Sequence, residues 1–484
     1  MSLAQVGIRG AYFTSIALGF RQVVSLATTF FVARQLLPSD IGVFSMVMVV
    51  VGLAQVVGDV GIATGLVRSQ KNSSTVLSTC FWINAGIGAI LMSLIMLLAP
   101  VAGWFYERAD VAPYLRVSAI GLFVNFMLPV PMALMQQRLA FKGISITQAT
   151  GSLVGAFITI ALVYAGFGVW GLVCQPIIGN LVILTMLAAF SKWRPTLEFN
   201  LASAKDILIS GMHLLGASIT GYVRNTFDVI IIGKNLSAQD LGIYGMAQTI
   251  LYAPMHLITS TVARVIFPLI AKVKDDLERL QDAVLTATAR TALLIFPLYF
   301  GLFALTDEFV MHVFGPNWSG MVPLIRIMAI SFLIQSIANV AGPLMLALNK
   351  SKIILIMSIG NAVVYFSILL ALIPYGLMVI ATGYAIANSI IALTSLGISL
   401  HFARISYRNY IKSIIKPFFM ALAMVMVMVI IEIRFEINTS SFLNFIILIV
   451  FGIITYTVLV VIFERAALNQ VMMALKSKST ANPS

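Results

Sequence analysis

The sequence predicts an all-α integral membrane protein: about fourteen transmembrane helices, in two six-helix bundles around a central cavity, followed by two further helices. Three observations predict this fold class. Hydrophobic residues make up 60% of the 484 residues and charged residues only 10%, whereas a soluble domain carries about 25% charged residues. The apolar residues form long continuous runs, which excludes a β-barrel, because apolar and polar residues alternate along the strands of a barrel. A motif near the start recurs about 200 residues later, which indicates a duplicated half.

The apolar runs follow one another with short polar connections. A membrane helix needs roughly 17–25 residues. The runs that reach this length are 11–33, 41–66, 76–105, 114–135, 144–166, 169–190, 207–232, 241–270, 283–305, 322–348, 353–373, 377–402, 414–433 and 442–463. A polar connection near residue 200 divides an N-terminal lobe, 1–200, from a C-terminal lobe, 201–404. The segment 405–484 then holds two extra helices and a cytoplasmic tail.

The connections alternate in charge. Those after the even-numbered runs are rich in lysine and arginine, whereas those after the odd-numbered runs are poor in both and carry acids such as Asp40, Glu107 and Asp240. The positive-inside rule then places both termini in the cytoplasm, as an even number of spans also requires. Because the net charge of +13 is spread over these short connections rather than over one soluble face, we expect no nucleic-acid partner.

Two pairs of segments support the duplication. The first pair is RQLLPSDIGVFSM at 34–46 and KNLSAQDLGIYGM at 234–246. The second pair is VAPYLRVSAI at 111–120 and MVPLIRIMAI at 321–330. Six runs separate the members of each pair, so the two halves have the same orientation in the membrane. Such parallel repeats are related by an axis along the membrane normal.

Three arginines within predicted membrane helices are the candidates for binding an anionic substrate. An arginine at the centre of such a helix costs at least about 2.5–3.5 kcal/mol, so each needs a reason to be there. Arg21 lies near the middle of run 11–33, where it either reaches the cavity or caps a carbonyl or forms an ion pair within the bundle. Arg224 lies in run 207–232 beside Asn225, which adds a donor and an acceptor. Arg264 lies in the cytoplasmic third of run 241–270 and either lines the cavity or extends to the interface.

Two aspartates accompany these arginines. Asp228 follows Arg224 by four residues on one helix face, close enough for an ion pair. It either neutralises Arg224 so that the helix inserts, or holds it until an anionic substrate competes. Asp59 lies deep in the first half, where it either pairs with Arg21 or binds a coupling proton or cation. Three arginines against two aspartates leave a positive balance, which favours phosphate or carboxylate oxygens as ligands.

Several classes of chemistry have no motif in this sequence. It has no P-loop and no cluster of histidine and cysteine with metal-ligand spacing, so we expect no ATP hydrolysis, no metal site and no bound cofactor. The longest outer connections have only roughly ten to fifteen residues, which is short for a catalytic site, so we expect no enzyme. What remains is transport driven by substrate supply or by a gradient of H⁺ or Na⁺.

Five stretches carry a resemblance to a known family. They are ARQLLPSDIGVFSMVMVVVGLAQVVGDVGIATGLVRSQ, QQRLAFKG, YVRNTFDVIIIGKNLSAQDLGIYGMAQTILYAPM, ARVIFPLIAKVKDDLERL and FGPNWSGMVPLIRIMAI. Their order and spacing resemble the polysaccharide transporter family of the multidrug/oligosaccharidyl-lipid/polysaccharide superfamily. Within that family the chain most resembles the O-antigen and exopolysaccharide flippases of the colanic-acid exporter type.

The resemblance implies a substrate and a site. The substrate is an undecaprenyl-diphosphate-linked oligosaccharide, moved from the cytoplasmic to the periplasmic leaflet of a bacterial inner membrane by alternating access, for surface polysaccharide synthesis. Polysaccharide polymerase and other assembly proteins are the implied protein partners, beside membrane lipids. The similar lipid II flippases hold diphosphate with arginines of the first and eighth helices, where Arg21 and Arg264 lie here. Arg224 and Asp228 lie in the stretch YVRNTFD, which resembles the polysaccharide transporter family more closely.

Two other functions stay open from the sequence. A multidrug antiporter of the same superfamily would take organic cations, and the positive balance of deep charges and the two extra helices count against it. A membrane-bound polysaccharide polymerase or ligase would need a long periplasmic loop, which the predicted topology lacks.

Overall fold

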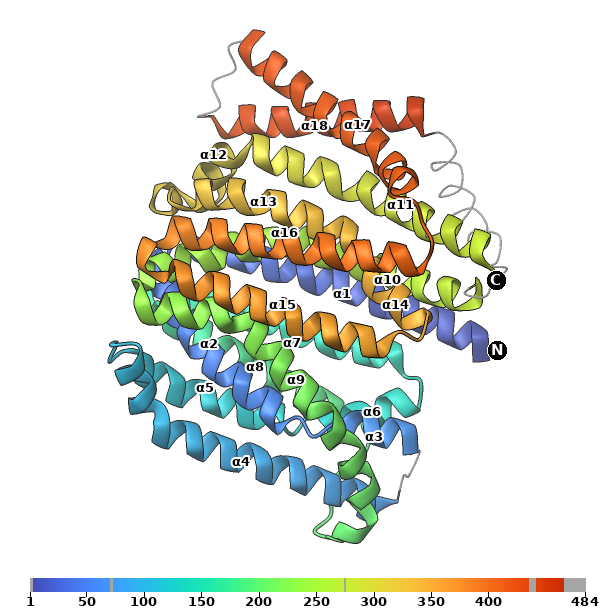
Figure 1. Ribbon diagram of the computed structural model, residues 1–484. Coiled ribbons are helices and arrows are strands. Elements are labelled where there is room, and N and C mark those ends of the chain that lie inside the picture. The colour runs from blue at the N-terminus through green and yellow to red at the C-terminus, as the bar shows by residue number, and fades with distance from the viewer. Residues whose placement is uncertain (1–2, 70–72, 274–275, 435–440, 465–484) are drawn as a thin grey trace, which may run out of the picture. The chain divides into compact units, whose positions relative to one another are not determined.

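The computed structural model describes residues 3–69, 73–273, 276–434 and 441–464, and every regular element in these ranges is helical (Figure 1). The α-helices are α1 (Leu3–Ala33), α2 (Pro38–Gly58), α3 (Ile62–Ser69), α4 (Ser74–Phe105), α5 (Val111–Asn125), α6 (Pro129–Gln137), α7 (Phe141–Leu162), α8 (Val169–Ser191), α9 (Leu201–Asn235), α10 (Ala238–Val273), α11 (Leu277–Ala304), α12 (Thr306–Phe309), α13 (Met321–Ala338), α14 (Ala341–Ala347), α15 (Ser351–Leu372), α16 (Leu377–Phe402), α17 (Tyr407–Arg434) and α18 (Phe442–Phe463).

Twelve spans in the described ranges are long and apolar enough to cross a membrane. This confirms the predicted class, an all-α multi-pass membrane protein, because lipid is the solvent that such helices require. The side chains of α9 and α10 are described only in part. The predicted number of about fourteen spans and the predicted central cavity therefore stay predictions.

Three predicted runs, 41–66, 114–135 and 322–348, each consist of two helices. Between α2 and α3, Gly61 has a left-handed φ of 66° and its amide donates a hydrogen bond to Asp59 Oδ1 at 3.0 Å, so the chain turns there. Pro129 begins α6, where its missing N–H is not needed. Each pair lies within one candidate span. The apolar runs thus predict these spans correctly, but the prediction that each run forms one continuous helix is wrong for these three.

The chain divides into two compact units, Met1–Gly245 and Met246–Ser484. In the first unit α7 packs on α1 and α8, α4 packs on α5, and α9 packs on α2 and α3. Because α9 packs on helices of the first half, it belongs to the first unit, although the repeat assigns it to the second lobe. The predicted lobes 1–200 and 201–404 and the segment 405–484 follow the repeat, and they stay predictions.

The polar connection after α8 lies along the start of α4. The amide of Thr196 donates to Ser78 Oγ at 3.0 Å, and Trp82 Nε1 donates to the Thr196 carbonyl at 2.8 Å. Thr75 Oγ1 donates to a Glu198 carboxylate oxygen at 2.5 Å. This connection is therefore an ordered part of the first unit.

The connection between α4 and α5 holds the end of α9. Lys234 Nζ forms an ion pair with Glu107 Oε1 at 2.7 Å. A Cβ atom placed on Gly233 would lie 3.0 Å from the ring of Tyr106, so this ring packs closely on the helix. The hydrogen bond from Lys234 lowers the pKa of Glu107 below its ordinary value of 4.5.

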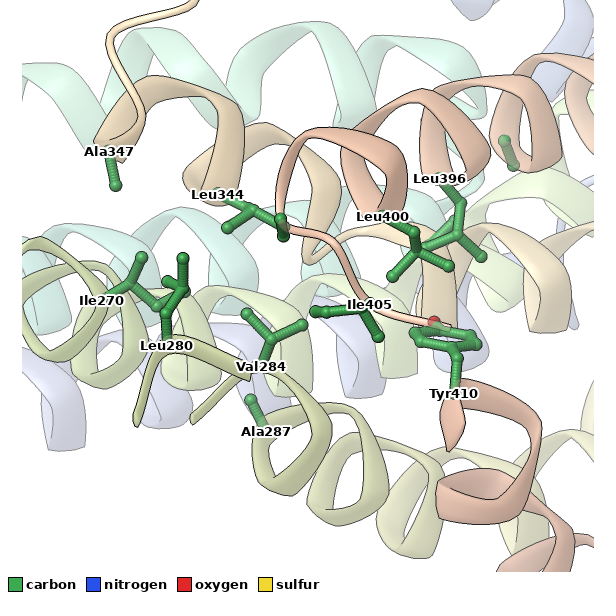
Figure 2. Close-up of a cluster of buried hydrophobic side chains, with 13 residues drawn as sticks. Ile270, Leu280, Val284, Ala287, Leu344, Ala347, Leu396, Leu400, Ile405 and Tyr410 are labelled. Atoms are coloured by element: carbon green, nitrogen blue, oxygen red, sulfur yellow. The ribbon is translucent and has the colours of Figure 1, made fainter. Parts of the chain in front are cut away.

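The core of the second unit joins α10, α11, the end of α13, α14, α16 and the start of α17 (Figure 2). Its buried side chains include Ile270, Leu280, Val284, Leu344, Leu400 and Tyr410. Tyr410 Oη donates to the Ile337 carbonyl at 2.8 Å, and Tyr456 Oη donates to the Leu293 carbonyl at 2.7 Å. These bonds fasten the two extra helices, α17 and α18, to α13 and α11.

The repeated motif has a structural role at the starts of α2 and α10. Asp40 Oδ2 accepts a hydrogen bond from the Leu37 amide at 3.0 Å, and Asp240 Oδ2 accepts one from Ser237 Oγ at 2.6 Å. Both aspartates therefore cap the first turn of their helix.

The repeated glycines let these two helix starts cross closely. A Cβ atom placed on Gly42 would lie 2.7 Å from the carbonyl carbon of Ala238, and one placed on Gly242 would lie 2.6 Å from that of Pro38. Pro38 and Ala238 are equivalent in the repeat, as are Gly42 and Gly242. The two copies thus contact one another reciprocally, as related elements do across a two-fold axis.

Candidate functional site

A polar pocket of about 490 Å³ lies within the first unit, among α1, α2, α7 and α8. Its polar side chains are Arg21, Gln22, Ser25, Ser152, Gln175 and Asn180. They come from helices that are otherwise apolar, and a polar side chain at such depth is costly unless it lines a cavity or has a partner. Within the described part of the chain, a pocket of this composition inside a membrane helix bundle is a candidate for a substrate site.

The backbone of α7 and α8 shapes one wall of the pocket. A Cβ atom placed on Gly151 would lie 2.9 Å from the Gly179 carbonyl oxygen, and one placed on Gly155 would lie 3.1 Å from that of Gln175. Glycine is therefore needed where the two helices cross. Pro176, inside α8, lacks the N–H that would bond to the preceding turn. In a membrane such a freed carbonyl is tolerated where it lines a cavity.

Arg21 is the one charged residue among the described residues that line this pocket. Its side chain is half-buried, and its Nη1 donates to Gln148 Oε1 at 3.2 Å. That bond occupies one of five donors, so the guanidinium retains further N–H groups for a ligand. The remaining polar groups are amides and hydroxyls, which both donate and accept. The pocket thus suits an anion together with a neutral ligand rich in hydroxyl groups.

Asp59 lies away from this group. It is exposed at the break between α2 and α3, where its carboxylate accepts the Gly61 amide. In the described part of the chain Arg21 bonds to Gln148, and no ion pair joins it to Asp59. The predicted pairing of Asp59 with Arg21 is therefore not found among the described residues, and both this pairing and a role in ion coupling stay predictions.

Asp228 is bonded to a tyrosine of the repeated motif. Its side chain is 1% exposed and accepts a hydrogen bond from Tyr244 Oη at 2.7 Å, while Tyr244 itself is 0% exposed. The predicted pairing of Asp228 with Arg224 stays a prediction. Arg224 is half-buried and Asn225 is exposed on α9, and neither lines the pocket. Their binding of substrate stays a prediction.

Two further points concern α9 and α10. Tyr222 Oη donates to the Val49 carbonyl at 2.8 Å, which fixes the part of α9 that carries Arg224 against α2. Arg264 lies in α10, but its side chain lies outside the described residues. Of the predicted arginines, the structure therefore places Arg21 in the pocket and Arg224 outside it.

Most polar side chains of the pocket are uncharged, so a sequence prediction based on charged residues did not include them. Gln22, Gln148, Gln175 and Asn180 each stand within an apolar run. An amide in a membrane helix is also a signal, since it needs a hydrogen-bond partner or a wet cavity. What the sequence does not contain is which of these amides share one pocket.

The fold and the pocket together define the general class of this protein, which is a helical membrane transporter with a polar site inside a helix bundle. The chain also matches the family described as "Polysaccharide biosynthesis protein" over residues 31–323, and it belongs to this family. The lipopolysaccharide biosynthesis protein WzxC of Escherichia coli K12 is 27% identical to it over 434 residues, which cover 87% of each protein.

Solved structures share the fold. The lipid II flippase MurJ, in an inward closed conformation, has a TM-score of 0.75 at 16% identity and covers 94% of this chain and 99% of its own. An inward-facing multidrug transporter of the MATE family has a TM-score of 0.62 at 14% identity and covers 79% of this chain and 94% of its own. At these identities the likeness concerns the fold alone.

Proposed function

We propose that this protein is a flippase, which moves an undecaprenyl-diphosphate-linked oligosaccharide from the inner to the outer leaflet of the bacterial inner membrane for surface polysaccharide synthesis. The observation that carries this proposal is the pocket of Arg21, amides and hydroxyls, within a chain of the polysaccharide biosynthesis family. Diphosphate oxygens match the guanidinium, and sugar hydroxyls match the amides.

The physical need for such a pocket follows from the substrate. A charged and hydroxylated headgroup cannot enter hydrocarbon without losing its hydrogen bonds, which costs several kcal/mol for each unsatisfied group. A polar pocket replaces those bonds with protein donors and acceptors. Alternating access of two lobes then exposes the site to each leaflet in turn, without a continuous pore.

A multidrug antiporter is disfavoured by the same pocket. A site for organic cations needs carboxylates or open aromatic faces, whereas the one charged residue lining this pocket, within the described chain, is an arginine. The family match points the same way.

Orientation, partners and energy source complete the proposal. Both termini lie in the cytoplasm, since the basic connections are those after the even-numbered runs. The flipped product is the substrate for a polysaccharide polymerase in the outer leaflet. Substrate supply or a gradient of H⁺ or Na⁺ drives the cycle, without a bound cofactor and without catalysis by this chain.

The test follows the leaflet position of lipid-linked repeat units in a strain that lacks this gene. Loss of a flippase leaves the repeat units in the inner leaflet, whereas loss of a polymerase leaves them in the outer leaflet. The proposal predicts accumulation in the inner leaflet, loss of surface polysaccharide and unchanged drug susceptibility. Accumulation in the outer leaflet, or hypersensitivity to cationic drugs with normal polysaccharide, contradicts it.

A further inference from the structure

The first turns of α17 carry basic residues on one exposed face. Arg408, Lys412 and Lys416 follow one another at intervals of four residues, so they project from the same side of the helix. All three residues are exposed. The buried side of the same turns carries Tyr410 and Pro417. The charged face therefore points away from the core of the second unit.

The position of these residues along α17 matches the depth of lipid headgroups. The helix has 28 residues, which is about 42 Å at 1.5 Å per residue. The hydrocarbon core of a bilayer is about 30 Å thick, so α17 is longer than this core and extends beyond it. The stretch 417–431 has no charged residue and fits the hydrocarbon. The basic face, which precedes it, then lies at the interface.

The surrounding contacts hold this face in place. Tyr410 Oη donates to the Ile337 carbonyl at 2.8 Å, and Tyr410 and Ile405 pack in the core drawn in Figure 2. Gln281 Nε2 donates to the Arg404 carbonyl at 2.8 Å, just before α17 begins. The helix start is therefore ordered before any ligand binds, which reduces the entropy lost on binding.

We propose that this basic face of α17 binds the phosphate headgroups of anionic phospholipids in the surrounding bilayer. Charge complementarity selects this ligand, since basic clusters at the end of a membrane helix attract anionic lipid. Arg408 and Lys412 lie one turn apart, about 6 Å along the helix axis, and they are the main ligands. Lys416 Nζ lies 3.7 Å from Glu464 Oε1, so its charge is shared. Exposed Ile415 offers the acyl chains an apolar surface beside these groups.

This site is independent of the flippase proposal. It lies in the second unit and involves none of the residues of the Arg21 pocket. If the protein transported no lipid-linked sugar, lipid binding at this site would still be expected. If the protein were a working flippase that bound no anionic lipid here, only the lipid-binding proposal would be contradicted.

The test measures lipid bound to the purified full-length protein. Native mass spectrometry counts phosphatidylglycerol molecules retained from mixed micelles, with phosphatidylcholine as the neutral reference. One basic residue near an anionic surface changes binding about fivefold, so the double variant Arg408→Gln/Lys412→Gln is expected to bind phosphatidylglycerol about 25-fold more weakly. The parent protein is expected to have a higher melting temperature in phosphatidylglycerol nanodiscs than in phosphatidylcholine nanodiscs. In the double variant this difference is expected to be smaller.

The matched control removes two exposed lysines elsewhere, Lys192→Gln/Lys205→Gln, in the first unit. It is expected to retain the parent's phosphatidylglycerol binding. A charge-preserving exchange, Arg408→Lys/Lys412→Arg, is also expected to retain it, which separates lost charge from a damaged helix. Equal losses in the double variant and the control, or no loss in either, overturn the proposal.

Discussion

Arg21→Gln is the change that best tests the pocket in the first unit. Glutamine is neutral and retains an N–H donor, although it ends two atoms short of the Nη1 that donates to Gln148 at 3.2 Å. The side chain is half-buried, and glutamine is a good helix former. We therefore expect insertion and folding to be little changed, while the charge that Arg21 brings to the pocket is removed.

The size of the effect follows from the lost contact. A hydrogen bond to a charged group contributes about 1.5–3 kcal/mol, more than a neutral one. At about 1.4 kcal/mol per factor of ten, the variant is expected to lose roughly 10- to 150-fold in transport efficiency. Arg21→Lys keeps the charge but not the forked donors, so its efficiency is expected to fall between parent and glutamine variant.

The assay measures flipping of a fluorescent or isotopically labelled lipid-linked oligosaccharide in proteoliposomes. The amount of protein and its orientation in the membrane are kept the same for all variants. Arg116→Gln serves as the control, since Arg116 is exposed on α5 in the same unit and does not line the pocket. Parent-like flipping by Arg21→Gln would remove the pocket from the mechanism. Equal losses in both arginine variants would show that only total charge matters.

Three further predictions concern stability. Gly42→Ala is expected to destabilise the protein by about 1–3 kcal/mol, because the new Cβ atom meets the backbone of the opposing helix. Gly245→Ala is the control and is expected to be tolerated, since its Cβ atom would lie 3.6 Å from a serine side chain. Thermal unfolding of both variants checks this prediction. Tyr244→Phe removes a donor from buried Asp228 and is expected to cost about 1–3 kcal/mol, again by thermal unfolding, with an unchanged melting temperature as the contrary result. Glu107→Gln removes the ion pair with α9; because the folded pKa of Glu107 is lowered, the parent's advantage in melting temperature is expected in full above about pH 4.5 and to vanish as the pH falls below it. An advantage that persists in acid contradicts that assignment.

The candidate site could be predicted only in part. Arg21 stands out in the sequence because a charge in an apolar run needs a reason, and the structure does place it in a pocket. Asp228 stands out equally, but the hydrogen bond that the structure shows for its carboxylate comes from Tyr244, on the next helix. Spacing along one helix shows which residues are able to meet. It does not show which neighbour on another helix is nearer.

The sequence by itself determined the solvent, the helices and the duplication of this protein. Continuous apolar runs require lipid and internal backbone hydrogen bonds, and both follow from local composition. Only the tertiary structure decided that the repeated Gly42 and Gly242 form a reciprocal crossing, that run 41–66 breaks beside Asp59, and that Arg21 shares a pocket with amides of α8. These features depend on contacts between residues distant in the chain, and such contacts are set by packing across helices, which a local pattern does not encode.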